Sequence, residues 1–394
     1  MSLRKEFVLR VLAKEAPVAE LCRRYHISRK TGYKWLKRFR AQGIDGLVDE
    51  SRRPLSSPEE TSPEMAHEIL ELRRAHSSWG AKKLRRVLMR KHGHEAPSVS
   101  TVERVLEKHG CIKRRRRRPG PRLVTPVRPT PMVAEPNDLW TVDFKGWWRA
   151  RNGQKCEPLT VRDAFSRYVL AIRLVPDLKG PTVQTIFREL FEEYGVPRAI
   201  QSDNGSPFAS TRALGGLTNL SAWWVSLGIE LVRSRPGCPQ DNGAHERMHA
   251  DMESEIRARV ADTRELQQRV CDEWRVDFNH VRPHEALEMA TPSERYRPSP
   301  RRPIVQTGAL RSDCERRTVD ARGWVAWRDQ RVYVTTALRG HTIGLLRTQE
   351  IVTVWFYQML LGTFRVGTGR SVQPPLPTSA LAVDLPPGNT AVTG

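Results

Sequence analysis

The sequence is poor in cysteine, in acidic residues and in long apolar runs, and each shortage excludes a class of protein. Its six cysteines among 394 residues lie far apart with no C-x-x-C pair, which argues against a zinc ribbon or a disulfide framework and favours a reduced compartment. No stretch is apolar enough to span a bilayer, and the start MSLRKEFVLR lacks the apolar core of a secretory signal. We therefore expect a soluble, unprocessed chain with no membrane partner.

The shortage of acidic residues leaves a large excess of positive charge. Lys and Arg number 66 against 44 Asp and Glu, a formal net charge of +22. The sequence pI is near 10.4. The excess is larger than solubility requires and is concentrated in blocks, so the composition predicts a polyanion, and specifically nucleic acid, as the partner.

Residues 1–50 are expected to form three short helices, and AELCRRYHISRKTGYKWLKRF within them is typical of a helix-turn-helix DNA-binding domain. Ser28 is the predicted N-cap of the third helix. Six apolar side chains are expected to pack the helices together: Val18, Leu21, Tyr25, Ile27, Tyr33 and Leu36. Four basic side chains are expected to face a DNA groove: Arg29, Lys30, Lys34 and Lys37. A plain three-helix bundle is the alternative.

A second helical unit is expected at residues 60–112, with two amphipathic helices and a third over SVSTVERVLEKHG that begins at Ser98 or Ser100. We interpret it as another helix-turn-helix-like DNA-binding domain. Residues 113–136 form a basic, Pro-rich linker in which prolines prevent a helix. Six adjacent cations are expected to contact phosphates, although a nuclear localisation signal is the competing interpretation: Lys113, Arg114, Arg115, Arg116, Arg117 and Arg118.

From residue 137 to 298 strands and helices alternate in the order βββαβαβα, which predicts an α/β mixed sheet flanked by helices. TRELQQRVCDEWRVDFNHVRPHEAL then has the pattern of one long amphipathic helix. Residues 320–368 contain short strands at regular spacing, as in a small SH3-like β-barrel. The Pro-rich tail at 370–394 is predicted to be disordered. The fold class is therefore multidomain, with all-α, α/β and all-β parts.

Three acids are placed where an active site would lie on this order. Asp143 falls inside an apolar strand, Asp203 follows a later strand at a turn, and Glu246 begins a helix. If the first and fourth strands are neighbours, these carboxylates meet at one edge of the sheet. Hard oxygen ligands without a thiolate suit Mg²⁺ or Mn²⁺. Asp163 and Asp241 are further candidates for such a cluster.

The stretch His245-Glu246-Arg247-Met248-His249 also fits H-E-x-x-H, the zinc site of metalloproteases. That interpretation leaves Asp143 and Asp203 without a role, and the two histidines precede a strongly charged helix rather than an apolar pocket. With the carboxylate interpretation, His245 and His249 are expected near DNA or behind the acids. Glu246 as a solvated acid at a helix start is the plainest alternative.

Several motifs in order resemble the bacterial insertion-sequence transposases that have a retroviral-integrase-like catalytic core: TVDFKG, DAFSRY, QSDNGSPF, PGCPQDNGAHERMH and FNHVRPHEAL. The resemblance covers nearly the whole chain and implies a ribonuclease H-like core. It implies that Asp143, Asp203 and Glu246 are the catalytic Asp-Asp-Glu triad and hold two Mg²⁺ or Mn²⁺ ions. The spacing of the last two acids exceeds the usual one, and the surplus fits in STRALGGLTNLSAWW.

The resemblance further implies a transposase that cleaves transposon ends and joins the freed 3′-hydroxyls to target DNA. Its partners would be double-stranded DNA, as terminal inverted repeats and target, and further copies of the chain in a dimer or larger assembly. Its expected place is the bacterial cytoplasm, associated with the nucleoid. Three alternatives remain: a DNA-binding regulator with an inactive core, a nuclease of the same fold, and the zinc protease.

The first prediction concerns the basic run in the linker. Replacing Arg114 to Arg118 with Gln should weaken binding to all duplexes alike and flatten the salt dependence by about one unit for each arginine that contacts a phosphate. Replacing Lys34 or Lys37 should act mainly on the transposon end. Titrations of end and random duplexes at several salt concentrations test this, and equal losses in both sets of variants would contradict the assigned roles.

Overall fold

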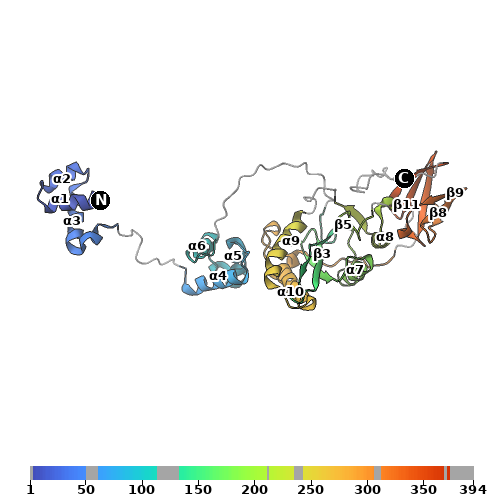
Figure 1. Ribbon diagram of the computed structural model, residues 1–394, viewed down its shortest axis with the longest axis horizontal. Helices are drawn as coiled ribbons and strands as arrows, with labels where there is room; N and C mark the ends of the chain where they lie inside the picture. Colours follow the sequence, from blue (N-terminus) through green and yellow to red (C-terminus); the bar gives the residue numbers. More distant parts are fainter. Residues whose placement is uncertain are drawn as a thin grey trace, which may run out of the picture. The chain divides into compact units, whose positions relative to one another are not determined.

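The computed structural model describes residues 3–49, 61–112, 133–210, 213–234, 243–305, 312–367 and 371–372. It divides into two compact units, Met1–Ser62 and Pro63–Gly394, which are coloured along the sequence in Figure 1. The basic run from Lys113 to Arg118 and nearly all of the tail lie outside the described residues. Within the described part of the chain, no helix is long and apolar enough to cross a membrane.

The N-terminal unit contains the three expected helices, α1 (Leu3–Leu12), α2 (Val18–Arg24) and α3 (Arg29–Gln42). The Ser28 hydroxyl accepts a hydrogen bond from the Thr31 amide at 3.1 Å, which confirms the predicted N-cap. A Cβ at Gly32 would lie 2.5 Å from the Cys22 sulfur. Glycine therefore permits the close approach of α3 to α2.

One packing prediction for this unit is wrong. Tyr33 is 59% exposed, and Trp35 is buried in its place beside Leu36. Residues 32, 35, 36 and 39 follow the three- and four-residue spacing of a single helix face, and Tyr33 falls outside it. The aromatic ring of Tyr33 consequently lies on the exposed face of the helix, with the basic residues.

The second unit begins with three helices, α4 (Pro63–Ala75), α5 (Ala81–His92) and α6 (Val99–Lys108). Of the two caps considered for α6, Ser98 is the one used, since its hydroxyl accepts from the Thr101 amide at 3.1 Å. A single apolar cluster that includes Ile69, Leu84 and Val102 holds the three helices together. The helices expected between 60 and 112 are therefore present.

A mixed sheet follows, with its strands in the order β2-β3-β1-β5-β6 and β4 paired to β3. β1 is antiparallel to β3 and parallel to β5, so the first and fourth long strands are neighbours as expected. The strands are β1 (Leu139–Phe144), β2 (Trp148–Arg149), β3 (Lys155–Asp163), β4 (Val169–Val175), β5 (Ala199–Ser202) and β6 (Glu230–Arg233).

Helices cover both faces of this sheet. One apolar cluster joins Trp140 and Val142 of β1 to the helices α7 (Gly180–Tyr194) and α8 (Asn219–Ser226). Another joins Val169 and Ile172 of β4 to α9 (Gly243–Ile256) and α10 (Arg264–Val276). Apart from the two-residue β2, the elements follow the expected order βββαβαβα along the chain. Figure 1 shows α9 and α10 on one side of β3 and α7 on the other.

The helix expected over residues 263–287 is shorter than its pattern suggested. α10 ends at Val276 and continues only as a π-helical turn, Asp277–Val281. Pro283 lies two residues after this turn, and a proline cannot donate the backbone hydrogen bond that the next turn would need. The chain then forms a short 3-10 turn, Glu285–Leu287, and the helix α11 (Pro292–Arg295).

The C-terminal part is a β domain. Its strands pair in the order β13-β12-β11-β10-β7, with β8 and β9 as a separate hairpin. No pairing among the described strands closes the sheet, so the SH3-like barrel stays a prediction. The strands are β7 (Glu315–Thr318), β8 (Trp324–Trp327), β9 (Gln330–Tyr333), β10 (Thr342–Thr348), β11 (Ile351–Phe356), β12 (Met359–Arg365) and β13 (Ser371–Val372).

Arg282, whose side chain is only 1% exposed, links three segments of the second unit. Its guanidinium pairs with Asp251 at 3.0 Å and with Glu255, both on α9. It also donates to the Ser78 hydroxyl, between α4 and α5, at 3.2 Å. A buried charge is tolerated only when it is paired in this way.

The second prediction concerns this buried cation. Arg282→Ala leaves two carboxylates without their partner, and removing one member of a buried ion pair costs roughly 3–5 kcal/mol of unfolding free energy. Arg269→Ala, on the exposed side of α10, is the control and should change stability by less than about 0.5 kcal/mol. Urea denaturation of the full chain measures both. Equal stability of the two variants would contradict this role of Arg282.

Candidate functional site

Asp143 lies on a polar strip of the sheet. On β1, Trp140 and Val142 point to the apolar face, so Thr141 and Asp143 point to the opposite face, toward α9. The antiparallel register places Thr160 opposite Asp143 and Arg162 opposite Thr141. Two neighbouring strands therefore present alternate polar side chains to α9. The polar strip consists of Thr141, Asp143, Thr160 and Arg162.

Asp203 lies directly after β5, the parallel neighbour of β1. The register pairs Thr141 with Gln201, and two further positions along each strand bring the chain to Asp143 and Asp203. The Gly205 amide donates to the Asp203 carboxylate at 3.2 Å. The buried guanidinium of Arg233 on β6 interacts electrostatically with Asp203. Burial lowers the pKa of Arg233 to about 10, and the negative charge of Asp203 opposes this effect.

Glu246 lies in the first turn of α9, with its side chain exposed. Burial, the negative charge of Asp203 and that of Glu246 together raise the pKa of Asp143 to about 6. Asp203 and Glu246 thus both act electrostatically on Asp143. Among the described residues, however, no set of three His, Cys, Asp or Glu side chains is already arranged to hold a metal ion.

Two buried histidines fix α9 to the polar strip. His245 uses both ring nitrogens: Nδ1 lies 2.7 Å from the Thr141 hydroxyl and Nε2 lies 2.7 Å from that of Thr160. His249 Nε2 lies 2.8 Å from the same Thr160 oxygen, and its Nδ1 lies 3.7 Å from the Asp143 carboxylate. Thr160 in turn donates to the Asp143 backbone carbonyl at 2.9 Å.

Of the two expected places for the histidines, near DNA or behind the acids, the structure favours the second, since His245 and His249 are 0% and 5% exposed. Burial holds the pKa of His245 well below its usual range and lowers that of His249 to about 4. Both rings are therefore neutral at pH 7. Because both nitrogens of His245 already bond to threonine, the H-E-x-x-H motif lacks one of the two imidazole ligands that zinc would need.

Thr141 and Thr160 were not identified from the sequence. The available signal was the alternation of polar and apolar residues in LWTVDF and PLTVRD, which places a threonine and an acid or arginine on one face of each strand. Asp163, in contrast, has a structural role. Its carboxylate accepts hydrogen bonds from the amides of Asn137 at 2.8 Å and Ser166 at 2.7 Å, and it is fully buried. Asp241 lies outside the described residues.

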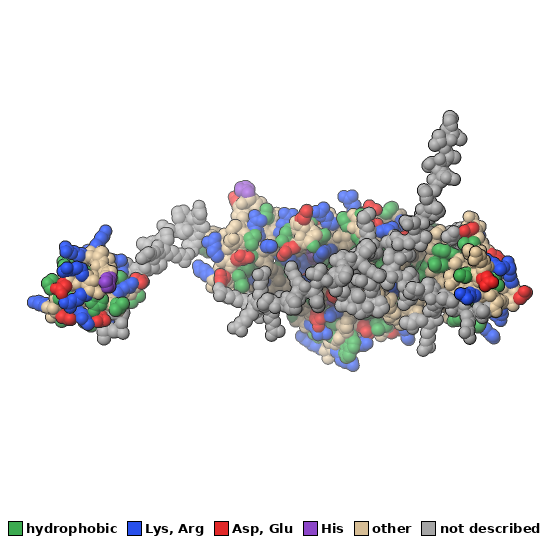
Figure 2. All heavy atoms as spheres, turned by 90° about the horizontal axis from the view of Figure 1, so that it is seen from above, with side chains coloured by type: hydrophobic (Ala, Val, Ile, Leu, Met, Phe, Trp, Pro, Cys, Tyr) green, Lys and Arg blue, Asp and Glu red, His purple; other side chains and the backbone are tan. Residues whose placement is uncertain are grey.

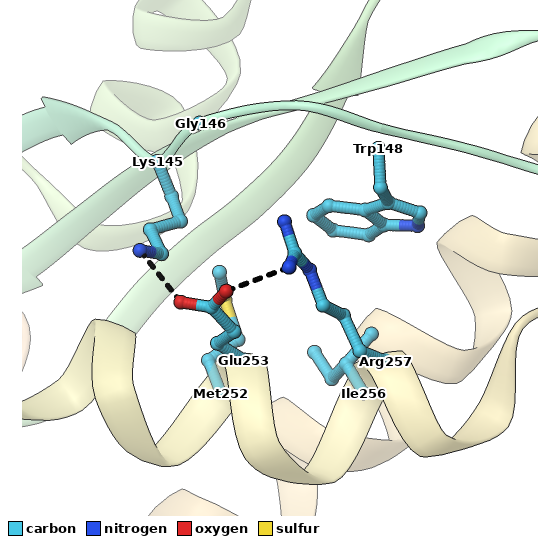
Figure 3. Close-up of a pocket in the computed structure, with 7 residues that line it drawn as sticks. All are labelled: Lys145, Gly146, Trp148, Met252, Glu253, Ile256 and Arg257. Atoms are coloured by element: carbon cyan, nitrogen blue, oxygen red, sulfur yellow. Dashed lines mark ion pairs between the residues drawn. The ribbon is translucent and has the colours of Figure 1, made fainter.

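An ion-pair chain continues the contact between β1 and α9 (Figure 3). Glu253 of α9 pairs with Lys145, two residues after Asp143, at 2.9 Å and with Arg257 at 2.8 Å. Trp148 and Met252 help line a cavity of only about 10 Å³ beside them. Such a cavity holds about one water molecule and no substrate. The cluster therefore fastens the helix that carries Glu246.

The predicted DNA-facing side chains of the N-terminal unit are exposed, namely Arg29, Lys30, Lys34 and Lys37. Tyr33 is exposed among them. Lys34 also lies 5.2 Å from the centre of the Trp35 ring, a cation–π contact. Figure 2 shows Lys and Arg side chains spread over the visible surface of this unit.

Comparison with known families agrees with this architecture. Two models, each described as an integrase core domain, match residues 133–239 and 227–292. A helix-turn-helix domain matches residues 3–54, and a homeodomain-like domain matches 31–106. The chain is therefore similar to helix-turn-helix domains in its N-terminal part and to integrase core domains in its central part.

Relatives encoded by insertion elements share much of the chain's length. The 39.2 kDa protein of insertion element IS476 of Xanthomonas euvesicatoria is 28% identical over 262 residues, which are 66% of this chain and 72% of that protein. The 31.7 kDa protein of IS407 of Burkholderia multivorans is 26% identical over 253 residues, 63% of this chain and 87% of the relative.

Among solved structures, the catalytic core domain of HTLV-2 integrase in complex with magnesium is similar to 41% of this chain and 97% of that domain. The identity is 16% and the TM-score is 0.33. The similarity to an integrase core comes from the two family models.

The third prediction follows from the neutral state of His249. The unfolded chain takes up a proton near the ordinary pKa of 6.5, and the folded chain only near 4. The stability that this group contributes is therefore complete above pH 6.5 and falls as the pH drops toward 4. Between pH 7 and pH 5, His249→Gln should lose about 2 kcal/mol less unfolding free energy than the wild type.

Denaturation curves at both pH values measure this difference. His67→Gln is the matched control, because that side chain is 72% exposed on α4 and should follow the wild type. An identical pH dependence in His249→Gln and the wild type would show that His249 is not held neutral by the fold.

Proposed function

We propose that this chain is a DNA transposase that binds transposon ends, cleaves phosphodiester bonds and joins the freed 3′-hydroxyls to target DNA. One observation carries the proposal. Asp143 lies near the end of β1, Asp203 directly follows the parallel neighbour β5, and Glu246 lies in the first turn of α9, which packs over the polar strip. Burial and the negative charges of Asp203 and Glu246 raise the pKa of Asp143. Carboxylates concentrated in this way favour a bound cation.

The donor set fits Mg²⁺ or Mn²⁺, because three carboxylates supply hard oxygen ligands with no thiolate or free imidazole among them. Asp143, Asp203 and Glu246 would hold the metal. When bound, two such ions lower the pKa of the attacking water and stabilise the leaving oxygen. The protein itself supplies the position of these carboxylates relative to the DNA backbone.

The residues behind the acids keep that position. The Thr160 hydroxyl donates to the Asp143 carbonyl while it meets both imidazoles. His249 faces the Asp143 carboxylate as a neutral ring. A neutral neighbour leaves the negative charge of Asp143 available to a cation, whereas a protonated histidine would compete with that cation.

The helical units supply DNA binding in this proposal. In the N-terminal unit the exposed cations and Tyr33 of α3 would enter a groove, and in 60–112 the helix α6 would do the same. The run from Lys113 to Arg118 would contact phosphates on the way to the core. Joining two ends requires at least two copies of the chain on DNA, so we propose a dimer or a larger assembly.

The fourth prediction tests the triad. Asp143→Asn, Asp203→Asn and Glu246→Gln each remove an anionic ligand while preserving shape, so strand transfer in Mg²⁺ should fall by at least about a hundredfold. Binding to duplex DNA should stay close to that of the wild type. The measurement is joining of labelled candidate end duplexes, with DNA affinity determined in parallel.

Asp262→Asn and Glu265→Gln are the controls, because both acids are exposed, at 68% and 67%. They should join at the wild-type rate. Full joining by Asp143→Asn would overturn the proposed mechanism. DNA binding by a wild-type chain that neither cleaves nor joins would instead identify a DNA-binding regulator, and cleavage without joining would identify a nuclease.

A further inference from the structure

The segment that follows Asp203 is packed against the C-terminal β domain. Leu214 and Leu217 of the segment, and Val225 of α8, share one buried cluster with Val334, Leu338 and Leu361 of that domain. At Gly215 a Cβ would lie 2.9 Å from the Leu361 side chain. Leu214, Leu217 and Val225 therefore form an attachment surface for this domain, and Figure 1 shows α8 beside β11.

The hairpin β8–β9 presents two exposed aromatic rings on its outer face. Trp324 and Tyr333 are a cross-strand pair, 37% and 41% exposed, with ring centres 5.4 Å apart. The Arg331 guanidinium lies 5.8 Å from the centre of the Trp324 ring. The Asp320 carboxylate accepts from the Trp324 backbone amide at 2.8 Å and pairs with Arg331 at 2.6 Å, which fixes the backbone at Trp324 and the side chain of Arg331.

A cavity of about 320 Å³ opens where this hairpin meets the segment after Asp203. Tyr333 forms one wall, so the aromatic pair leads into it. The remaining lining is small and polar or aliphatic: Ser210, Ala213, Leu217, Thr218, Asn219, Thr335, Thr336 and Ala337. An aromatic wall combined with hydroxyl and amide groups suits a flat ring with polar edges.

We propose that this cavity and the T-shaped Trp324–Tyr333 pair bind an unpaired nucleotide of a DNA end, with its base stacked on the Tyr333 ring at the cavity wall and its polar edge turned toward Asn219 and Thr336. The inference rests on the proposed DNA substrate and adds a binding site for single-stranded DNA to it. Base stacking on aromatic side chains, interleaved with arginines that meet phosphates, is the chemistry that holds single strands.

The position of the cavity supports this ligand. Ser210 follows Asp203 by seven residues, which limits their Cα separation to about 24 Å. A DNA strand advances about 3.4 Å per nucleotide, so the cavity lies within about seven nucleotides of a phosphate at Asp203. The Phe208 carbonyl accepts from Arg233 at 2.8 Å, and the Pro207 carbonyl accepts from Thr218 at 2.8 Å. These bonds hold the connecting segment in place.

The test compares the affinity of the full chain for a blunt DNA duplex and for the same duplex with a 3′ overhang of thymidines, by fluorescence anisotropy in EDTA. The wild type should prefer the overhang. Because one stacked base contributes about 1–3 kcal/mol, the Trp324→Ala/Tyr333→Ala variant should lose about tenfold or more in overhang affinity while blunt-duplex affinity is unchanged. Asn219→Trp, which fills the cavity from an exposed position, should have the same effect.

Two further variants separate stacking from folding. Trp324→Phe/Tyr333→Phe keeps the rings and should keep the preference. Leu360→Ala removes an exposed apolar side chain of the same domain, 37% exposed, and should leave the preference unchanged. A wild type that binds both duplexes equally, or an alanine variant with an intact preference, would overturn this inference alone. A chain with no affinity for either duplex would overturn the proposed function itself.

Discussion

The contact on which the candidate site depends is the hydrogen bonding between two neutral imidazoles of α9 and two threonines of the sheet. It is a polar contact inside an otherwise apolar interface, and its atoms have no access to water that would replace a lost partner. It determines the rotation and height of α9 on the sheet, and therefore where Glu246 lies relative to Asp143. A purely apolar interface would bury more apolar surface, but it would let α9 slide along the sheet.

The order of helices and strands was predictable because each element carries its own period and its own boundary signals. Ser28 and Ser98 cap helices as expected, and the alternation in LWTVDF correctly indicates a strand. Errors occurred where local pattern and tertiary context disagree. Tyr33 was counted among the apolar side chains expected to pack the helices together, yet its position on α3 lies outside the buried face of that helix. Pro283 ends a helical pattern that hydrophobic spacing alone would continue.

The acids of the candidate site were proposed from the sequence, whereas the residues that support them were not. Asp143 stands out because a charge inside an apolar strand is costly unless it is paired or binds a cation, whereas an acid in the first turn of a helix, such as Glu246, is common. The role of His245 and His249 depends on which side chains face them across 85 to 104 residues of sequence, and no local pattern encodes that pairing. From the sequence alone, the H-E-x-x-H motif therefore fits a zinc site, whereas in the fold its two histidines attach α9 to the sheet.

The shared apolar cluster of the segment after Asp203 and the C-terminal β domain also has a consequence for biosynthesis. Leu214 and Leu217 emerge from the ribosome well over a hundred residues before Leu361. Until β12 has been made, the apolar side chains of this segment lack part of their final packing. The sheet and its first helices can form before the β domain is made, whereas the surroundings of Asp203 reach their final packing only after β12 has been made. Synthesis of the β domain therefore sets the earliest time at which the region around this acid can be complete.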